Sequence, residues 1–141
     1  MKRCLTLLVA AGLVYAGLNV TREAQGGKKV DNRVFELRTY YANPGKMEAL
    51  HARFREHTNK LFVKHGMTLI GYWSPIDAKE AQEKLIYILA YPSKEAAAAS
   101  WKGFQNDPDW KTAKAKSEEQ GPLVAKVVSV YMNPTDYSPI K

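Results

Sequence analysis

The feature that most constrains this chain is a strand-like segment that leads through a tight turn into a long helix. Residues 34–41 are rich in β-branched and aromatic side chains and alternate in character, as expected of a half-buried strand. Asn43, Pro44 and Gly45 then mark a turn. From residue 44 to residue 64, apolar side chains recur at steps of three and four, so they share one face of a helix. This opening predicts a domain that combines strands with helices.

The rest of the chain also consists of predicted strands and helices that follow one another. Strands are predicted over residues 67–73, 84–91 and 123–132, with a polar hairpin connection over residues 76–83. Ser93 is a suitable helix cap for a second helix that ends near Asn106, and a short third helix is expected over residues 109–117. The order is β-α-β-β-α-β. It predicts the α+β class, with a ferredoxin-like arrangement of helices on one face of a four-stranded antiparallel sheet.

The N-terminal segment has the pattern of a targeting signal. Lys2 and Arg3 precede residues 4–20, which carry no charge and have an apolar centre. We therefore expect an exported protein, periplasmic or secreted. An uncharged stretch of this length is near the lower limit of about 17 residues for spanning a bilayer, so residues 4–20 are a membrane tether if the segment is not cleaved.

Four regions follow from these patterns. We predict a signal peptide or N-terminal anchor over residues 1–25, a linker over 26–33, the folded domain over 34–132 and an extended C-terminal tail over 133–141.

Charge and cysteine content exclude several function classes. The formal net charge is +7, but lysines alternate with glutamates and form no run of five or six, so we expect no nucleic-acid partner. The only cysteine, Cys4, lies in the predicted leader, which leaves the domain without a disulfide or a thiolate metal site. His51, His57 and His65 lack the spacing of metal ligands. We predict no metal and no cofactor.

The predicted sheet is apolar on both faces. In residues 84–91, one face carries Leu85, Tyr87, Leu89 and Tyr91, and the other carries Ile86, Ile88 and Ala90. The helices of one chain can cover only one of these faces. Leaving three or four such side chains in water forfeits about 1.5–3 kcal/mol each. A symmetric homodimer with its sheets face to face is therefore expected.

Several segments carry a family resemblance. They are 36–40 (Glu-Leu-Arg-Thr-Tyr), 44–46 (Pro-Gly-Lys), 64–66 (Lys-His-Gly), 69–73 (Leu-Ile-Gly-Tyr-Trp), Tyr91 before a helix of Glu-Ala-Ala type, and 106–110 (Asn-Asp-Pro-Asp-Trp). In this order, over residues 34 to about 132, they resemble the NIPSNAP family. The resemblance implies a dimeric α+β barrel, related in shape to small monooxygenases that oxidise polyphenolic substrates without a cofactor. It implies no agreed reaction, and the family's roles in vesicle and mitochondrial biology do not transfer to an exported domain.

Seven side chains are candidates for ligand binding: Glu36, Arg38, Tyr40, His57, Tyr72, Trp73 and Tyr87. Glu36 and Arg38 share one face of the first strand, where charges are unusual. They form either an ion pair that fixes the packing or a polar spot at which Arg38 holds an anionic or carbonyl ligand. His57 lies on the apolar helix stripe, either buried and hydrogen bonded or facing a pocket between helix and sheet. The aromatic residues either fill the core or line an apolar pocket.

Two functions are consistent with these residues. The first is an exported, homodimeric module that binds a small apolar or aromatic ligand, or a protein. The alternative is a cofactor-independent enzyme, similar to a monooxygenase or isomerase, that uses an inter-sheet cavity with His57, Arg38 and a tyrosine. A cavity of a few hundred Å3 reached by His57 or Arg38 would favour the enzyme. No paired acid and base is recognisable, so no catalytic residue is predicted.

Overall fold

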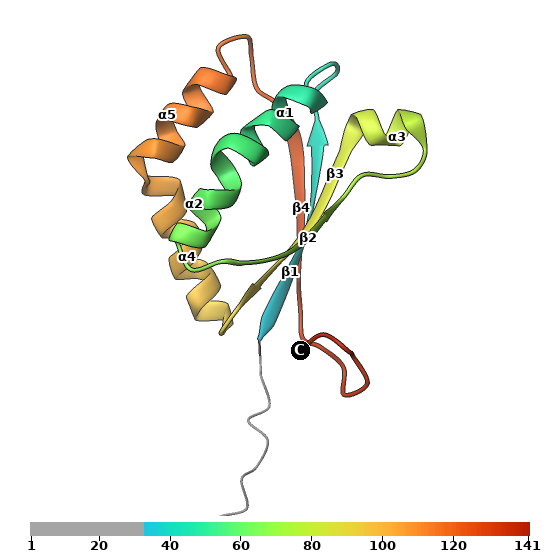
Figure 1. Ribbon diagram of the computed structural model, residues 1–141, viewed down its shortest axis with the longest axis vertical. Helices are drawn as coiled ribbons and strands as arrows, with labels where there is room; N and C mark the ends of the chain where they lie inside the picture. The colour runs from blue at the N-terminus through green and yellow to red at the C-terminus, as the bar shows by residue number, and fades with distance from the viewer. Residues whose placement is uncertain (1–32) are drawn as a thin grey trace, which may run out of the picture.

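The computed structural model describes residues 33–141, in which a four-stranded antiparallel sheet carries helices on one side (Figure 1). The strands are β1 (Val34–Ala42), β2 (Thr68–Trp73), β3 (Lys84–Tyr91) and β4 (Val124–Met132). Their spatial order is β2-β3-β1-β4, with β1 paired to both β3 and β4. The predicted α+β, ferredoxin-like arrangement is confirmed. The predicted leader and residues 26–32 of the linker lie outside the described residues.

Helices cover one face of this sheet. They are α1 (Met47–Arg53), the π-helical turn η1 (Phe54–Thr58), α2 (Asn59–Lys64), α4 (Lys94–Asn106) and α5 (Pro108–Ser117). A further short helix, α3 (Ala78–Glu83), occupies most of the connection that was expected to be a hairpin loop. It forms because Asp77 caps its first turn, accepting a hydrogen bond from the Glu80 backbone N–H at 2.9 Å. In the part of the chain that the structure describes, no helix has the length and apolarity needed to cross a membrane.

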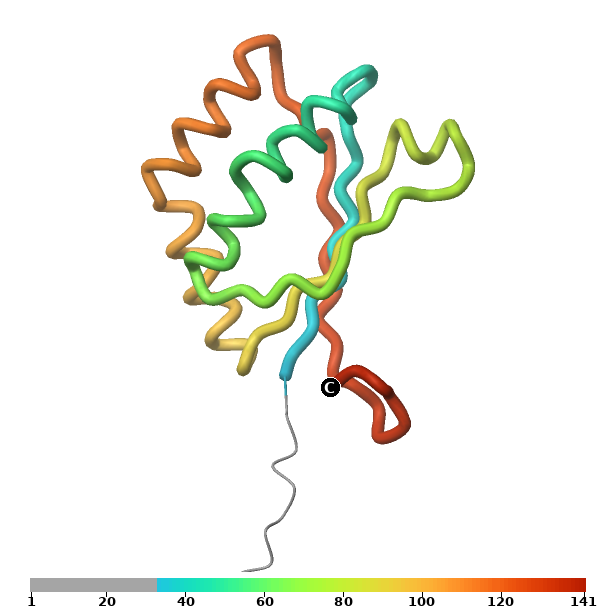
Figure 2. The backbone as a smooth tube through the Cα atoms, viewed as in Figure 1, coloured from blue at the N-terminus to red at the C-terminus, as the bar shows by residue number. Residues whose placement is uncertain are grey.

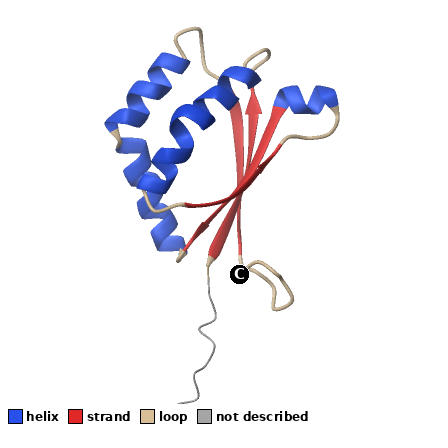
Figure 3. Cartoon of the chain, in the orientation of Figure 1, coloured by secondary structure: helices blue, strands red, loops and turns tan. Residues whose placement is uncertain are grey.

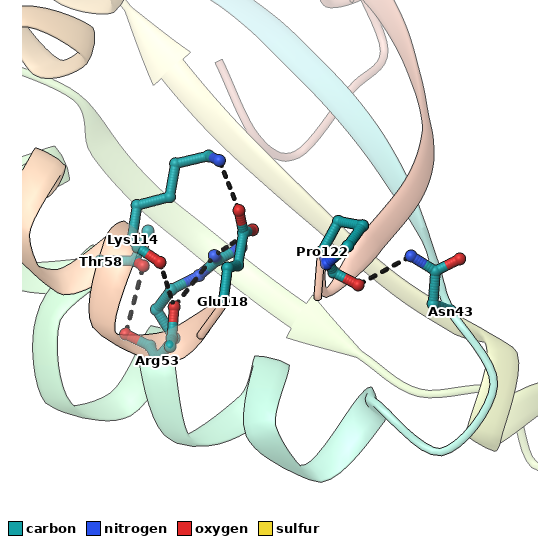
Figure 4. Close-up of polar contacts among 7 residues, drawn as sticks. Asn43, Arg53, Thr58, Lys114, Glu118 and Pro122 are labelled. Carbon is teal, nitrogen blue, oxygen red and sulfur yellow. Dashed lines mark hydrogen bonds and ion pairs between the residues drawn. The ribbon is translucent and has the colours of Figure 1, made fainter. Parts of the chain in front are cut away.

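The first long helix differs from the prediction at its start and in its middle. It begins at Met47 because residues 43–46 form a turn, in which Gly45 has a φ of 73° and Lys46 N–H bonds to the Asn43 carbonyl at 3.0 Å. In η1 the backbone N–H of Asn59 bonds to the Phe54 carbonyl, a step of five residues instead of four. The Thr58 hydroxyl also donates to the Arg53 carbonyl at 3.2 Å (Figure 4).

This π-turn changes which side chains face the sheet. Thr58 and Phe62 are buried, whereas the side chain of His57 is 40% exposed. The predicted stripe is therefore wrong at His57, because one extra residue in the turn rotates the residues that follow around the helix axis.

The other helices start where the sequence indicates. Ser93 caps α4 by accepting from the Ala96 N–H at 3.1 Å, as predicted. Helix α5 starts one residue earlier than expected, at Pro108, because proline suits the first turn and Asp107 accepts from the Asp109 N–H at 2.8 Å.

The two faces of the sheet have different surroundings. Figure 3 shows α1–α2 and α4–α5 stacked on one side, while α3 and the C-terminal tail project on the other. The helix-covered side holds most of the core, including Leu50, Phe62, Leu85, Tyr87, Leu89 and Phe104. The opposite side, which we call the helix-free face, carries Leu37, Trp73, Ile86, Ile88, Val128 and Val130.

Side-chain contacts fix the ends of β1 and α5 together. The β1–α1 turn and the α5–β4 loop lie side by side in the backbone trace (Figure 2), where Asn43 Nδ2 donates to the Pro122 carbonyl at 2.7 Å. Nearby, the buried Arg53 guanidinium pairs with Glu118 at 2.8 Å (Figure 4). The same guanidinium lies over the Trp110 ring. These contacts join α1 to the end of α5.

Candidate functional site

The carboxylate of Glu36 is the centre of a buried polar network on the helix-covered side of the sheet. Glu36 is only 1% exposed, yet it accepts hydrogen bonds from four side chains that come from β1, β3, α4 and β4. They are Arg38 Nη1 (2.5 Å), Tyr91 OH (2.7 Å), Trp101 Nε1 (2.8 Å) and Ser129 Oγ (2.6 Å). Both carboxylate oxygens are therefore occupied by protein donors.

These donors control the ionisation of Glu36. Burial alone would raise its pKa, but the hydrogen bonds from Ser129, Tyr91 and Trp101, and the charge of Arg38, together hold the pKa below its ordinary value. The carboxylate is thus a stable anion. A group that is already bonded to four donors is poorly suited to take a proton from a substrate.

Arg38 extends from Glu36 over an aromatic surface. Its guanidinium lies 4.1 Å from the centre of the Trp101 ring and 5.5 Å from that of Tyr40. Burial would lower the pKa of Arg38, but the neighbouring Tyr87, Tyr40 and Glu36 raise it, so the group stays charged. The Glu36–Arg38 ion pair exists, as the first of the two sequence-based interpretations expects.

Three tyrosines of the candidate set form a cluster beside this network. Tyr40 meets Tyr87 edge to face with 5.3 Å between ring centres, and Tyr72 stacks on Tyr87 at 5.4 Å. Phe54, from η1, closes the cluster with contacts to all three tyrosine rings at 5.3–5.8 Å. Burial raises the pKa of Tyr72, whose hydroxyl has no hydrogen-bond partner among the described residues.

A pocket opens between η1 and β2 at the edge of this cluster. It has a volume of about 230 Å3 and includes Phe54, Asn59, Tyr72 and Leu85 in its walls. The side-chain oxygen of Asn59 is buried and, like the Tyr72 hydroxyl, lacks a partner in the part of the chain that is described. We call this space the π-turn pocket.

The structure brings five of the seven candidate residues to one side of the sheet. Glu36, Arg38, Tyr40, Tyr72 and Tyr87 face the helices. Trp73 alternates to the helix-free face, opposite Ile86, and its ring lies against Gly71, where an added Cβ would be only 2.7 Å from a ring carbon.

His57 lies apart from the other candidates. It lines a groove of about 610 Å3 between α2 and α5, together with Lys60, Lys64, Asp109 and Lys116. It therefore faces a space between two helices instead of one between helix and sheet.

Sequence reasoning missed two parts of the site. Ser129 is the serine of the valine-rich β4, and in the strand register it lies opposite Arg38. A small polar side chain between two valines was a usable signal. Asn59 carried no such signal, because its position depends on the π-turn.

The strand order and the one-sided helices define a ferredoxin-like α+β domain with a buried carboxylate on the helix-covered side. Residues 35–139 match the NIPSNAP family, and the chain belongs to that family. The match continues into the tail, beyond residue 132 where the sequence-based resemblance ended. No curated protein matches the chain.

Solved structures share the fold at low sequence identity. A NIPSNAP family protein of unknown function from Agrobacterium tumefaciens is 20% identical, with a TM-score of 0.67 over 79% of this chain and 96% of the other. An uncharacterized NIPSNAP-like domain protein from Burkholderia xenovorans is 18% identical, with a TM-score of 0.66 over 77% of this chain and 90% of the other. A protein from Nitrosomonas europaea described as a putative antibiotic biosynthesis monooxygenase is 13% identical, with a TM-score of 0.55 over 77% of this chain and 95% of the other.

Proposed function

We propose that this protein is an exported homodimer that binds a small apolar or aromatic ligand and performs no catalysis of its own. The observation that carries the proposal is the helix-free face, which is apolar and only partly covered within one chain, because the C-terminal tail borders it at Phe35 and Ile88. On it, Trp73 and Val130 are each 48% exposed and Val128 is 37% exposed. An exposed apolar patch of this kind is typical of an interaction surface.

A second copy of the chain is the occupant that fits this face best. Leu37 and Val130 pair across β1 and β4, and Ile86 and Ile88 continue the same apolar surface on β3. A two-fold axis through the middle of the sheet would place each apolar strand against another one. Covering several such side chains contributes about 1.5–3 kcal/mol each, which is comparable with the stability of a small domain.

Binding is favoured over catalysis because the charged groups of the candidate site already have partners within the protein. Glu36 is saturated with donors and Arg38 is held by Glu36 and Trp101, so neither is free to transfer a proton. His57 lines a different cavity from Tyr72. The monooxygenase named in the Nitrosomonas comparison shares the fold, which alone does not supply a reaction.

The dimer is tested by size-exclusion chromatography with light scattering. At micromolar concentration we expect twice the mass that mass spectrometry gives for the purified chain. A folded monomer at that concentration would overturn the dimeric part of the proposal.

Export rests on the basic and apolar character of residues 1–25. Expression with the native leader in a Gram-negative host, followed by cell fractionation, should place the protein outside the cytoplasm or on the inner membrane. Recovery of the intact chain in the cytoplasmic fraction alone would overturn it.

A further inference from the structure

We infer that the groove between α2 and α5 binds a small organic phosphate, with the phosphate between Lys60, Lys116 and His57 and the organic part on the floor of the groove. We call this space the α2–α5 groove. Such a site goes beyond the proposed function. The residues that line the groove all come from η1, α2 and α5, whereas the proposed dimer uses the helix-free face on the other side of the sheet (Figure 3). The site is therefore complete within one chain.

Ion pairs close both ends of the groove. At one end, Lys64 Nζ lies 2.8 Å from Asp107 and 3.5 Å from Asp109, at the start of α5. At the other end, Arg53 pairs at 2.8 Å with Glu118, which directly follows α5. The two helical segments therefore run antiparallel, and the cations at each end already have carboxylate partners.

The middle of the groove carries cations on both walls. His57 and Lys60 are three residues apart, so they lie on one face of the first segment. Lys116 is two residues before Glu118, which places it toward the His57 end of the opposite wall. Among the described residues, neither Lys60 nor Lys116 forms an ion pair, and Glu56, which lies 3.8 Å from His57 Nε2, is itself 67% exposed. Cations that face each other in this way repel unless an anion lies between them.

This arrangement of charges selects a dianion. A phosphate attached to an organic hydroxyl carries about −1.5 to −2 charges at pH 7, so one group can pair with both lysines, whereas a carboxylate has a single charge. Lysine binds phosphate as a point charge, and an imidazole N–H can donate to a phosphate oxygen. Asp109 repels an anion at its own end of the groove, which places the phosphate at the His57 end.

The floor and the size of the groove accommodate an organic part. Leu61 and Ala113 are only 4% and 7% exposed and line the groove, so its floor is apolar. The volume of about 610 Å3 lies within the range of roughly 300–1,000 Å3 that is typical of small-molecule sites. Inorganic phosphate would leave most of this space unfilled. An apolar group attached to the phosphate gains the contact with the floor.

The π-turn is what brings His57 into the groove. Within η1, Thr58 is the buried residue, and the side chain of His57 is left 40% exposed between the two helices. Turns of this kind occur often at functional sites. The irregularity therefore adds a hydrogen-bond donor where two lysines already face each other.

The test is a titration of the 15N-labelled full-length chain with phenyl phosphate, followed by two-dimensional NMR at low salt. We expect saturable shifts at residues 57–61 and 112–116. Inorganic phosphate should shift the same residues but bind at least about three-fold more weakly, because it has no ring to cover the apolar floor. Benzyl alcohol keeps a ring without a charge and should cause no saturable shifts there. Raising NaCl from about 20 mM to about 200 mM should weaken phenyl phosphate binding several-fold, because the charges are exposed.

Variants assign the effect to the two lysines. Lys60→Gln and Lys116→Gln should each weaken phenyl phosphate binding about two- to five-fold, as for the loss of one exposed charge pair, and the double variant should weaken it further. Both side chains are exposed, so the fold should be retained. The matched control is Lys79→Gln, which removes the same charge from an exposed position on α3, outside the groove, and should leave the affinity unchanged.

Absence of saturable shifts at millimolar phenyl phosphate, shifts confined to another surface, or equal effects of Lys116→Gln and Lys79→Gln would overturn the site. Phosphatidate vesicles present the same phosphate on a membrane. Co-sedimentation with them that depends on Lys60 and Lys116, without saturable binding of phenyl phosphate, would assign these lysines to a membrane surface and also overturn the site. Light scattering on the same samples separates the site from the dimer, because a monomer that shows the expected shifts overturns only the homodimer.

Discussion

Trp101 donates its indole N–H to the Glu36 carboxylate across 2.8 Å, and the same indole ring supports the Arg38 guanidinium at 4.1 Å. One side chain on α4 therefore holds both members of an ion pair on β1. This arrangement explains how two charged residues can lie within an otherwise apolar sheet, because each charge is paired and hydrogen bonded. It also fixes the position of α4 over the sheet.

We expect Glu36→Gln to destabilise the fold by about 2–4 kcal/mol, because it leaves Arg38 without its counter-charge and turns an amide NH2 toward groups that donate. Urea unfolding followed by circular dichroism measures the change. Glu48→Gln is the matched control, since that side chain is 83% exposed, and it should stay within about 0.5 kcal/mol of the parent. Equal stabilities of the two variants would contradict a structural role for the network.

Stability should also depend on pH through Glu36. Its pKa in the folded state lies below the ordinary value of 4.5, so its contribution is complete above that pH and is lost as the pH falls through the folded-state pKa. The pKa values of Asp107 and Glu118 are lowered as well, and these groups act in the same direction. The difference in unfolding free energy between the parent and Glu36→Gln isolates the contribution of Glu36. We expect that difference to be constant from pH 7 to 5 and to shrink toward pH 3; a difference that grows on acidification would contradict the sign.

Much of the fold could be predicted because its signals are local. The strand over residues 84–91 is bounded by a polar connection and a proline, and Ser93 caps the next helix with its own hydroxyl. The partners of Glu36 are different, since Trp101 and Ser129 lie 65 and 93 residues further along the chain. No spacing rule connects positions that meet only through tertiary packing.

The π-turn explains the main difference between the predicted and the observed face of the first long helix. Apolar residues in the first long helix follow steps of three and four, and nothing in that pattern indicates an inserted residue. The turn moves His57 toward α5 and brings Asn59 to the π-turn pocket. A single backbone irregularity thus changes which side chains of this helix face the sheet, in a way that the sequence did not suggest.

The contact between Arg53 and Glu118 should couple α1 to α5 energetically. Both side chains are largely buried, at 3% and 15% exposure, and the pair is 2.8 Å apart. In a double-mutant cycle with Arg53→Met and Glu118→Gln, we expect a coupling energy of about 1–3 kcal/mol. The exposed pair Arg55–Glu48 provides the matched cycle and should give no more than about 0.5 kcal/mol. Equal coupling in both cycles would show that burial does not strengthen the Arg53 pair.

The helix-free face should not tolerate a charge if it is the dimer interface. Val130 is 48% exposed and lies opposite Leu37 on this face, so Val130→Glu would bury a carboxylate against the apolar sheet of a partner. We expect the dimer dissociation constant to rise at least about 100-fold, because an unpaired charge in an interface costs several kcal/mol. Val63→Glu is the control, since Val63 is 58% exposed on α2, away from this face. Light scattering over a dilution series measures both variants. Dissociation caused equally by the two substitutions, or by neither, would show that the subunits do not pair through the helix-free face.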